Sequence, residues 1–329
     1  MVDLALSQDV SSSPSSARLR RSYRTDRWFH RLTLACAFLV LALFAGIFWS
    51  LLRGAWPAIQ AFGLPFIWTQ VWNPVTQKFG GLAPIAGTLI TSFLAMLVAI
   101  PVGIGIAIFL TEICPRPLRR PIGIAVELLA GIPSIIYGIW GLFVLAPVLQ
   151  QSVIPVLIAT FAGVPVLSSL FAGPPYGIGM FTAALILSIM TIPFISAITR
   201  DVFEAVPPVL KEAAYALGST NWEVLWNVVL PYARSGVAGG VMLALGRALG
   251  ETMAVTFVIG NAHRISTSLF APGTTISAAI ANEFTEAVGD LYLPSLVELG
   301  LLLFFVTFIV LAAAQFMLHR LELRAGSRT

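Results

Sequence analysis

Long apolar runs, separated by short polar stretches, dominate this chain. A helix that crosses a bilayer needs about 20 mostly apolar residues, and six runs are long enough to supply one. The first run follows a polar, serine-rich tail and is too long for the apolar part of a signal peptide. The pattern predicts an all-α membrane protein with six transmembrane helices, at residues 30–52, 83–111, 122–149, 177–199, 236–260 and 294–318.

Another apolar run, at residues 153–172, is also long enough to cross the membrane. Pro155, Gly163 and Pro165 interrupt it. Counting it as a seventh span would place the basic C-terminus outside, against the excess of arginine and lysine found in cytoplasmic loops. Irregular backbone is tolerated at membrane depth where protein covers it. We therefore expect a re-entrant or interfacial segment, and the sequence leaves both forms open.

Arginines mark one side of the predicted membrane protein. Because cytoplasmic loops are rich in arginine and lysine, their positions predict that both termini are cytoplasmic. This gives a cytoplasmic polar tail at residues 1–28, a transmembrane domain at 29–320 and a cytoplasmic tail at 321–329. The arginines concerned are Arg18, Arg20, Arg21, Arg24, Arg27, Arg31, Arg116, Arg119, Arg120, Arg320, Arg324 and Arg328.

The composition supports a membrane protein and excludes several functions. Hydrophobic residues make up 58% of the chain and charged residues 10%, far more apolar than a soluble domain. The net charge of +4 comes from arginines that flank the spans, so it does not indicate a nucleic-acid partner. No metal-ligand spacing is present. Neither Lys78 nor Lys211 follows a glycine-rich phosphate loop, so the chain has no ATPase motif of its own. A transporter or channel subunit is the default expectation.

Arg247 and Glu251 lie inside the predicted fifth span. A charge near the bilayer centre costs about 2.5–3.5 kcal/mol on insertion scales, so an intramembrane arginine is a functional-site hypothesis by default. The i,i+4 spacing would put both side chains on one helix face. We interpret the pair as part of a substrate pathway, and a structural ion pair to neighbouring helices is the alternative.

Glycines occur at regular intervals along the same span. Gly236 and Gly240 are four residues apart, as are Gly246 and Gly250. This GxxxG spacing is typical of membrane helices whose backbones approach closely. We therefore expect all four glycines to serve helix packing.

The longest predicted cytoplasmic loop, residues 200–235, has the pattern of a helix, a turn and a second helix. Gly218 suits a left-handed residue after a helix, and Asn221 or Ser219 could cap the second helix, which we expect to end at Pro231. The spacing of Glu-Ala-Ala, glycine and Leu-Pro resembles the EAA loop of bacterial ABC importer permeases. The resemblance implies that this loop docks on a cytoplasmic ATPase through Glu212, Ala213, Ala214, Gly218 and Pro231.

Further stretches narrow this resemblance to the PstC family of phosphate permeases. The RALGE core around Arg247 would also fit the partner family, PstA, whereas residues 79–111 and 268–284 favour PstC. The resemblance covers the chain from about residue 79 to its end. It is carried by residues 79–93, 128–145, 173–208, 236–261 and 268–284.

The resemblance implies a type I ABC importer permease fold, with a core at about 82–318 and a coupling loop at 200–235. It also implies a permease subunit of the bacterial inner membrane that imports inorganic phosphate. A PstA-like permease would form a heterodimer with this chain, beside a PstB-like ATPase dimer and an extracytoplasmic phosphate-binding protein. ATP and Mg would be bound by the ATPase, leaving no cofactor in this chain, and Arg247 and Glu251 would be critical for transport.

Other functions remain open from the sequence. An ABC permease for sulfate or molybdate would carry a similar EAA loop, although its fifth helix would not be expected to match. A self-sufficient channel or carrier often shows inverted repeats, and the pattern at 236–260 has no second copy. A membrane component that senses phosphate would share the same surfaces.

Overall fold

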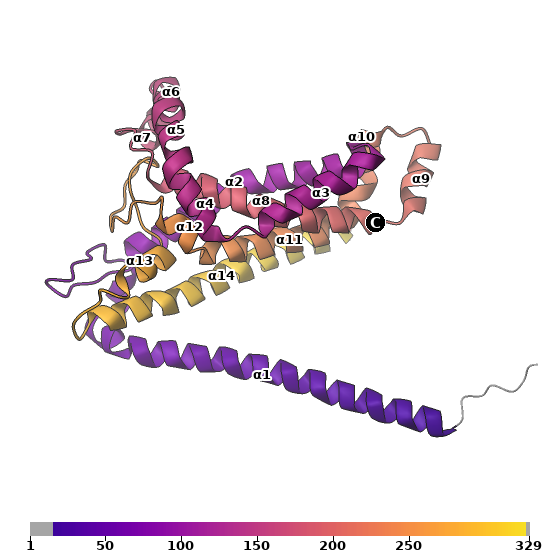
Figure 1. Cartoon of the computed structure of the whole chain (residues 1–329), viewed down its shortest axis with the longest axis horizontal. Coiled ribbons are helices and arrows are strands. Elements are labelled where there is room, and N and C mark those ends of the chain that lie inside the picture. Colours follow the sequence, from indigo (N-terminus) through magenta and orange to yellow (C-terminus); the bar gives the residue numbers. More distant parts are fainter. Residues whose placement is uncertain (1–15, 327–329) are drawn as a thin grey trace, which may run out of the picture. The chain divides into compact units, whose positions relative to one another are not determined.

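The computed structural model describes residues 16–326, whose regular secondary structure is helical, with an isolated β-bridge between Asn73 and Lys78 in a loop (Figure 1). The chain divides into two compact units, Met1–Arg53 and Gly54–Thr329. The predicted tails at 1–28 and 321–329 lie partly outside the described residues. The α-helices are α1 Ser16–Phe62, α2 Leu82–Ile108, α3 Arg116–Ala130, α4 Ser134–Trp140, α5 Ala146–Val148, α6 Ile154–Phe161, α7 Pro165–Leu170, α8 Met180–Glu204, α9 Pro208–Ala216, α10 Asn221–Val224, α11 Leu230–Gly250, α12 Met253–Thr256, α13 Ile276–Glu283 and α14 Tyr292–Gly326.

Six helical stretches in the described residues are long and apolar enough to cross a membrane, which confirms the predicted number. Four of them lie close to the predicted positions, and the third and fifth are displaced along the sequence. The observed stretches are Asp26–Phe62, Leu82–Ile113, Ser134–Phe161, Met180–Glu204, Asn221–Gly250 and Tyr292–Leu318.

Proline explains how several of these stretches are built. Each of the four π-helical turns in the described residues ends two residues before a proline, at Pro115, Pro147, Pro155 and Pro231. Proline has no N–H, and its ring clashes with the carbonyl group four residues earlier. A wider turn relieves that clash and lets neighbouring groups take up the freed carbonyl. At three of the four prolines the helix therefore continues instead of ending.

The third span begins later than predicted. Residues 122–130 belong to α3, and Pro133 separates that helix from α4. Gly131 is the C-cap of α3 and Pro133 is the N-cap of α4, so the break falls between them. From α4 the helix continues through two π turns and α6 to Phe161. The expectation of a re-entrant or interfacial segment at 153–172 is therefore wrong for the first half of this run, which completes the third span. The second half contains the short α7, and the described chain has no separate seventh span there.

The fifth span begins and ends earlier than predicted. The expectation that a short helix ends at Pro231 is wrong, because the π turn Leu225–Val229 carries the helix through this proline into α11. The helix then stops at Gly250, and Glu251 adopts an extended backbone with φ −66° and ψ 130°. The loop between the fourth and fifth spans is consequently shorter than the predicted 200–235, and it contains α9.

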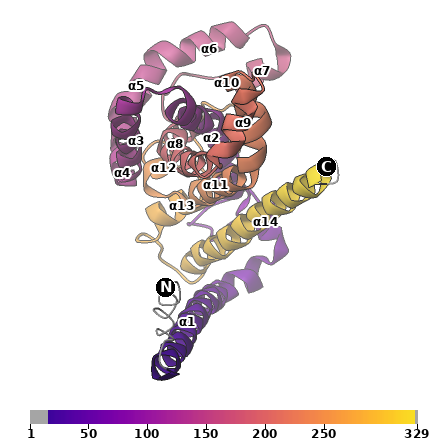
Figure 2. The ribbon, with the colours of Figure 1, turned by 90° about the vertical axis from the view of Figure 1, so that its right-hand side faces the viewer.

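The core of the larger unit is the packing of α8 against α2 and α11, seen in both views (Figures 1 and 2). Its buried side chains include many small ones, such as Ala95 and Ala99 on α2 and Ala244 on α11. Gly240 and Gly236 let α11 approach α8 closely, since an added β-carbon would lie 2.8 Å from Ile198 and 2.6 Å from Val202. Small residues at the contact are expected where lipid supplies no hydrophobic drive for helix association.

Figure 1 shows α9 at one end of these central helices and α13 near the other, which we call the α9 end and the α13 end. A polar cluster holds the loops of the α13 end together around the Glu283 carboxylate. Trp72 Nε1 and the Tyr292 hydroxyl donate to Glu283 Oε2 at 2.7 and 2.8 Å. His263 Nε2 hydrogen-bonds Oε1 at 2.6 Å, and its ring stacks on Trp72 with centroids 4.7 Å apart. One carboxylate thus joins the loop that carries Trp72 to His263 and Tyr292, which lie on either side of Glu283 in the sequence.

The close contact at Gly240 predicts a position-specific loss of stability. Gly240→Val should press two methyl groups against Ile198 and lower the free energy of unfolding by about 1–3 kcal/mol, the usual cost of overpacking. Gly239→Val is the matched control, because Gly239 has nothing within 4 Å of an added β-carbon. Thermal unfolding of both proteins in detergent checks this, and equal midpoints for the two variants would contradict it.

The Glu283 cluster predicts a loss of stability in acid. Burial by itself raises the pKa of the Glu283 carboxyl, but hydrogen bonds from His263, Tyr292 and Trp72 and the charge on His263 outweigh burial and lower the pKa. A lowered folded-state pKa stabilises the protein above the ordinary glutamate pKa of about 4.3, and this stabilisation is lost as the pH falls through the folded pKa. Stability should therefore decline below about pH 4.3.

Glu283→Gln should abolish this component of the acid sensitivity and cost about 1–3 kcal/mol at neutral pH, because buried donors lose a charged acceptor. The exposed Glu286 offers the matched control, Glu286→Gln. The measurement is the unfolding midpoint as a function of pH. An acid-induced decline of the same size in the Glu283→Gln protein as in the wild type would show that another group is responsible.

Candidate functional site

Arg247 lies in the last turn of α11 and is partly buried. Its guanidinium carbon lies 4.4 Å from the centroid of the Phe194 ring on α8, a cation–π contact. Its Nε is buried and has no hydrogen-bond partner in the described part of the chain. The side chain is therefore held by an aromatic face while a buried donor stays unsatisfied, which is an arrangement suited to an anion.

Glu251 does not lie on the same helix face as Arg247. Because α11 ends at Gly250, Glu251 sits on extended backbone, and its Oε1 accepts a hydrogen bond from the Ala254 backbone N–H at 3.3 Å. Within the described residues no ion pair joins it to Arg247. The expected i,i+4 pair on one continuous helix is therefore wrong, and Glu251 instead caps the start of α12.

Residues 208–224, which we call the α9 segment, contain α9, a turn and α10, and this turn is the one that the sequence predicts. Gly218 has φ +88°, which confirms the left-handed conformation, and its N–H donates to the Tyr215 carbonyl at 2.9 Å. Neither Asn221 nor Ser219 caps the next helix. Thr220 does so, because its hydroxyl accepts from the Glu223 N–H and the Glu223 carboxylate accepts from the Thr220 N–H. The Thr-x-x-Glu signature of this capping box was readable in the sequence.

An ion pair connects α9 to the end of the second span. Lys211 Nζ lies 2.7 Å from Glu112 Oε1, and both side chains are mostly buried. Tyr215, on the same helix, has a raised hydroxyl pKa because of burial and the nearby charge of Glu112. Glu112 and Lys211 are 99 positions apart, so no local sequence pattern could have revealed the pair.

The rest of the α9 segment is open to its surroundings. Glu212, Ala213 and Gly218 are exposed, Ala214 is partly buried, and Pro231 is exposed on the following helix. Leu217 is 89% exposed, Val209 70% and Trp222 63%. Exposed apolar side chains spread over α9, the turn after it and α10 are typical of an interaction surface.

The four predicted packing glycines fall into two groups. Gly236 and Gly240 face α8 at short distance, as described above. An added β-carbon at Gly246 would lie 3.6 Å from Leu311 on α14, an ordinary contact, whereas Gly250 has nothing within 4 Å. Within this chain, therefore, only Gly236 and Gly240 lie at positions where a larger side chain would not fit.

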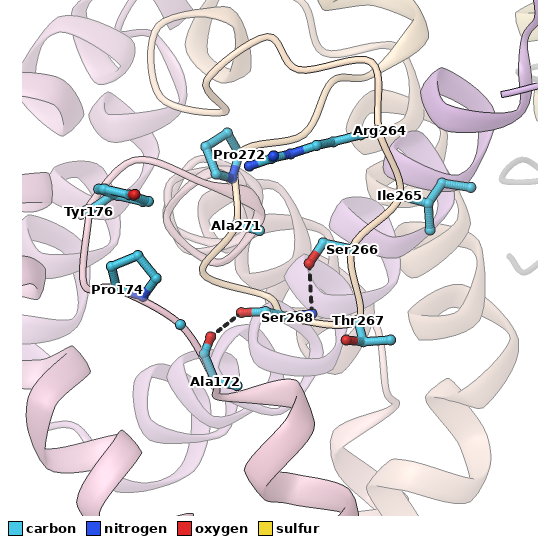
Figure 3. A pocket seen from close by; sticks show the side chains of 11 residues that line it. Ala172, Pro174, Tyr176, Arg264, Ile265, Ser266, Thr267, Ser268, Ala271 and Pro272 are labelled. Carbon is cyan, nitrogen blue, oxygen red and sulfur yellow. Dashed lines mark hydrogen bonds between the residues drawn. The ribbon is translucent and has the colours of Figure 1, made fainter. Parts of the chain in front are cut away.

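A pocket of about 550 Å³ opens at the α13 end (Figure 3). Arg264 is the only charged residue among those lining it, and the Ser266, Thr267 and Tyr176 hydroxyl groups also line it. Ser268 joins the two walls, because its hydroxyl donates to the Ala172 carbonyl at 2.5 Å. The sequence showed Arg264 only as a loop charge, since the approach of residues 172–176 to 264–272 is set by tertiary structure.

Comparison with known families matches residues 99–323 to the binding-protein-dependent transport system inner membrane component. The chain is 67% identical over 315 residues to a phosphate transport system permease protein PstC of Mesorhizobium japonicum, covering 96% of each chain. It is 55% identical over 300 residues to a PstC of Pasteurella multocida, covering 91% of this chain and 93% of that one.

A solved structure shows the same fold at low sequence identity. The chain matches a bacterial alginate ABC transporter, crystallised in complex with an alginate pentasaccharide-bound periplasmic protein, with a TM-score of 0.60 and 18% identity over 92% of this chain and 98% of that chain. The fold is thus that of a type I ABC importer permease. Six apolar helices and the family match make it a multi-pass protein of the bacterial inner membrane. The chain belongs to the binding-protein-dependent transport system inner membrane components, within the family of PstC permeases.

Proposed function

We propose that this chain is a permease subunit of an ATP-driven importer and that it carries inorganic phosphate across the inner membrane. Arg247 carries the proposal, because it is a charged group in a membrane helix with a buried donor that no group in the described residues satisfies. The planar guanidinium group of arginine forms charge-assisted, bidentate hydrogen bonds to phosphate oxygens. The names of the relatives at 67% and 55% identity support phosphate over other anions.

Passage through a membrane requires weak binding, because an anion that is held tightly does not leave. The Phe194 ring lies on the Arg247 guanidinium and occupies one of its faces. Glu251 follows directly after α11, where its negative charge would reduce the affinity of this region for an anion. Arg247 would then provide a transient contact for phosphate, with Glu251 limiting how long it stays.

The partners follow from the same proposal. A PstA-like permease would complete the pathway, and a PstB-like ATPase dimer would bind ATP and Mg and hydrolyse the nucleotide. The exposed α9 turn, with Glu212, Ala213, Ala214 and Gly218, would dock on that ATPase, and Pro231 lies on the helix that follows. The α9 end and both termini would then be cytoplasmic. The Arg264 pocket at the α13 end would face an extracytoplasmic phosphate-binding protein.

A permease for sulfate or molybdate is the rival within transport, and a phosphate-sensing component is the rival outside it. The names of the relatives argue against the first. Both rivals are separated from the proposal by reconstituting the chain with its candidate partners in vesicles. Phosphate-stimulated ATP hydrolysis coupled to phosphate uptake, with no response to sulfate, is the expected result.

In that assay Arg247→Gln should reduce phosphate uptake roughly tenfold or more, because a hydrogen bond to a charged group contributes about 1.5–3 kcal/mol. Arg247→Lys should give an intermediate loss of uptake, since lysine keeps the positive charge but lacks the planar, bidentate guanidinium group. Arg234→Gln is the control, because it removes an exposed charge from the same helix. Wild-type uptake by the Arg247→Gln protein, with normal amounts in the membrane, would leave Arg247 a structural residue.

The Gly218 turn makes a separate prediction. Gly218→Val should lower uptake and association with the ATPase, because φ +88° is strained for a β-branched residue. Gly218→Asn is the matched control, since asparagine tolerates the left-handed region. Copurification of the ATPase and phosphate uptake measure the effect. Full association in the valine variant would argue against this turn as the docking element.

A further inference from the structure

A second pocket, of about 410 Å³, opens at the α9 end beside α3 and the end of α8. Its walls are unusually basic for so small a space, with four arginines against two glutamates. Ile124 is the single apolar side chain among the lining residues. The pocket is lined by Arg116, Arg119, Arg120, Ile124, Glu127, Arg200 and Glu204.

The acidic groups in this pocket are already engaged by Arg200. Its guanidinium lies 2.5 Å from Glu127 Oε1 and 3.9 Å from Glu204 Oε1, and it also pairs with Asp201 at 3.2 Å. Arg200 reaches Glu127 across Gly123, where an added β-carbon would lie 2.7 Å from Arg200 Nη1. Arg200 is thus the partner of all three carboxylates, and within the described residues none of them pairs with an arginine of α3.

The three arginines of α3 have unused capacity to bind an anion. Arg119 donates through Nη2 to the Thr111 carbonyl at 2.5 Å, while its buried Nε has no hydrogen-bond partner in the described residues. Arg116 and Arg120 are exposed, and within residues 16–326 neither forms an ion pair. Guanidinium groups arranged around a small pocket are well suited to phosphate oxygens.

Apolar side chains continue from the pocket along α3. Leu118 is 50% exposed, Ile124 47% and Leu128 69%. An arginine pocket that adjoins an exposed apolar surface at the end of membrane helices has the two parts that a phospholipid would need, a cationic site for the headgroup and a surface for its chains. Inorganic phosphate would use the cationic site alone.

We propose that the pocket formed by Arg116, Arg119 and Arg120 binds a phosphate group, supplied by the headgroup of an anionic phospholipid or by inorganic phosphate. This site is separate from Arg247. Arg200 follows Phe194, the partner of Arg247, by six residues, about 9 Å along α8 at 1.5 Å per residue. The proposal therefore stands whether or not Arg247 contacts the transported anion.

The test uses the full-length chain in the Arg247→Gln background, so that phosphate bound at Arg247 does not contribute. One arm measures by native mass spectrometry how much phosphatidylglycerol stays bound after extraction from vesicles of phosphatidylcholine and phosphatidylglycerol. The other arm measures equilibrium binding of radiolabelled inorganic phosphate in detergent. The variant is Arg116→Gln/Arg120→Gln, and Arg234→Gln/Arg320→Gln removes two exposed charges elsewhere as the matched control.

The Arg116→Gln/Arg120→Gln protein should lose roughly tenfold or more of its affinity in one arm, given about 1 kcal/mol per basic residue near an anionic surface. Loss of phosphatidylglycerol identifies a lipid, and loss of labelled phosphate identifies the free anion. Arg116→Lys/Arg120→Lys should recover part of the binding, which shows that a folded pocket persists. Unchanged binding in both arms, or an equal loss in the control, would overturn the proposal.

Discussion

The close packing of α8 against its neighbours is the contact on which the rest of the structure depends. Lipid tails are as apolar as leucine, so membrane helices associate through van der Waals contact between small residues. Val202 and Ile198 of α8 pack against Gly236 and Gly240 of α11, and Ile195 of α8 packs against Gly103 of α2. The same helix carries Phe194 beneath Arg247 and Arg200 beside the arginines of α3. Packing of one helix thus positions both charged regions.

Backbone hydrogen bonding imposes the second constraint. In lipid an unpaired backbone group costs several kcal/mol, so a proline in a spanning helix must be accommodated. In the third and fifth spans the π turns before Pro147, Pro155 and Pro231 do this and keep the helices continuous. Where the break does occur, after Gly250, the Glu251 carboxylate satisfies an N–H of α12. Glu251, which the sequence suggested as the partner of Arg247, therefore also stabilises the start of α12.

The two ends of the central helices are built differently. At the α13 end, one carboxylate, Glu283, joins distant loops around a pocket-bearing surface, and its hydrogen bonds are internal. At the α9 end, the Lys211–Glu112 pair fixes α9 against the second span while the apolar side chains around Gly218 stay exposed. An anchored segment with an exposed apolar turn would suit the ATPase docking proposed above, since motion of a docked partner would pass into the second span.

The sequence alone determined the helical class, the number of spans, the left-handed turn at Gly218 and the family, because these depend on composition, local propensity and motif spacing. It located Arg247 as an unusual charge in an apolar helix, but not its aromatic partner Phe194. Tertiary structure decided where the third and fifth spans begin and end, because π turns let the helix continue through some prolines, whereas the helix is interrupted at Pro133. It also decided that α11 ends before Glu251, that Arg200 forms an ion pair with Glu127, and that Lys211 forms one with Glu112. These contacts join residues far apart in sequence, and their energies depend on distance and burial, which only the packed helices define.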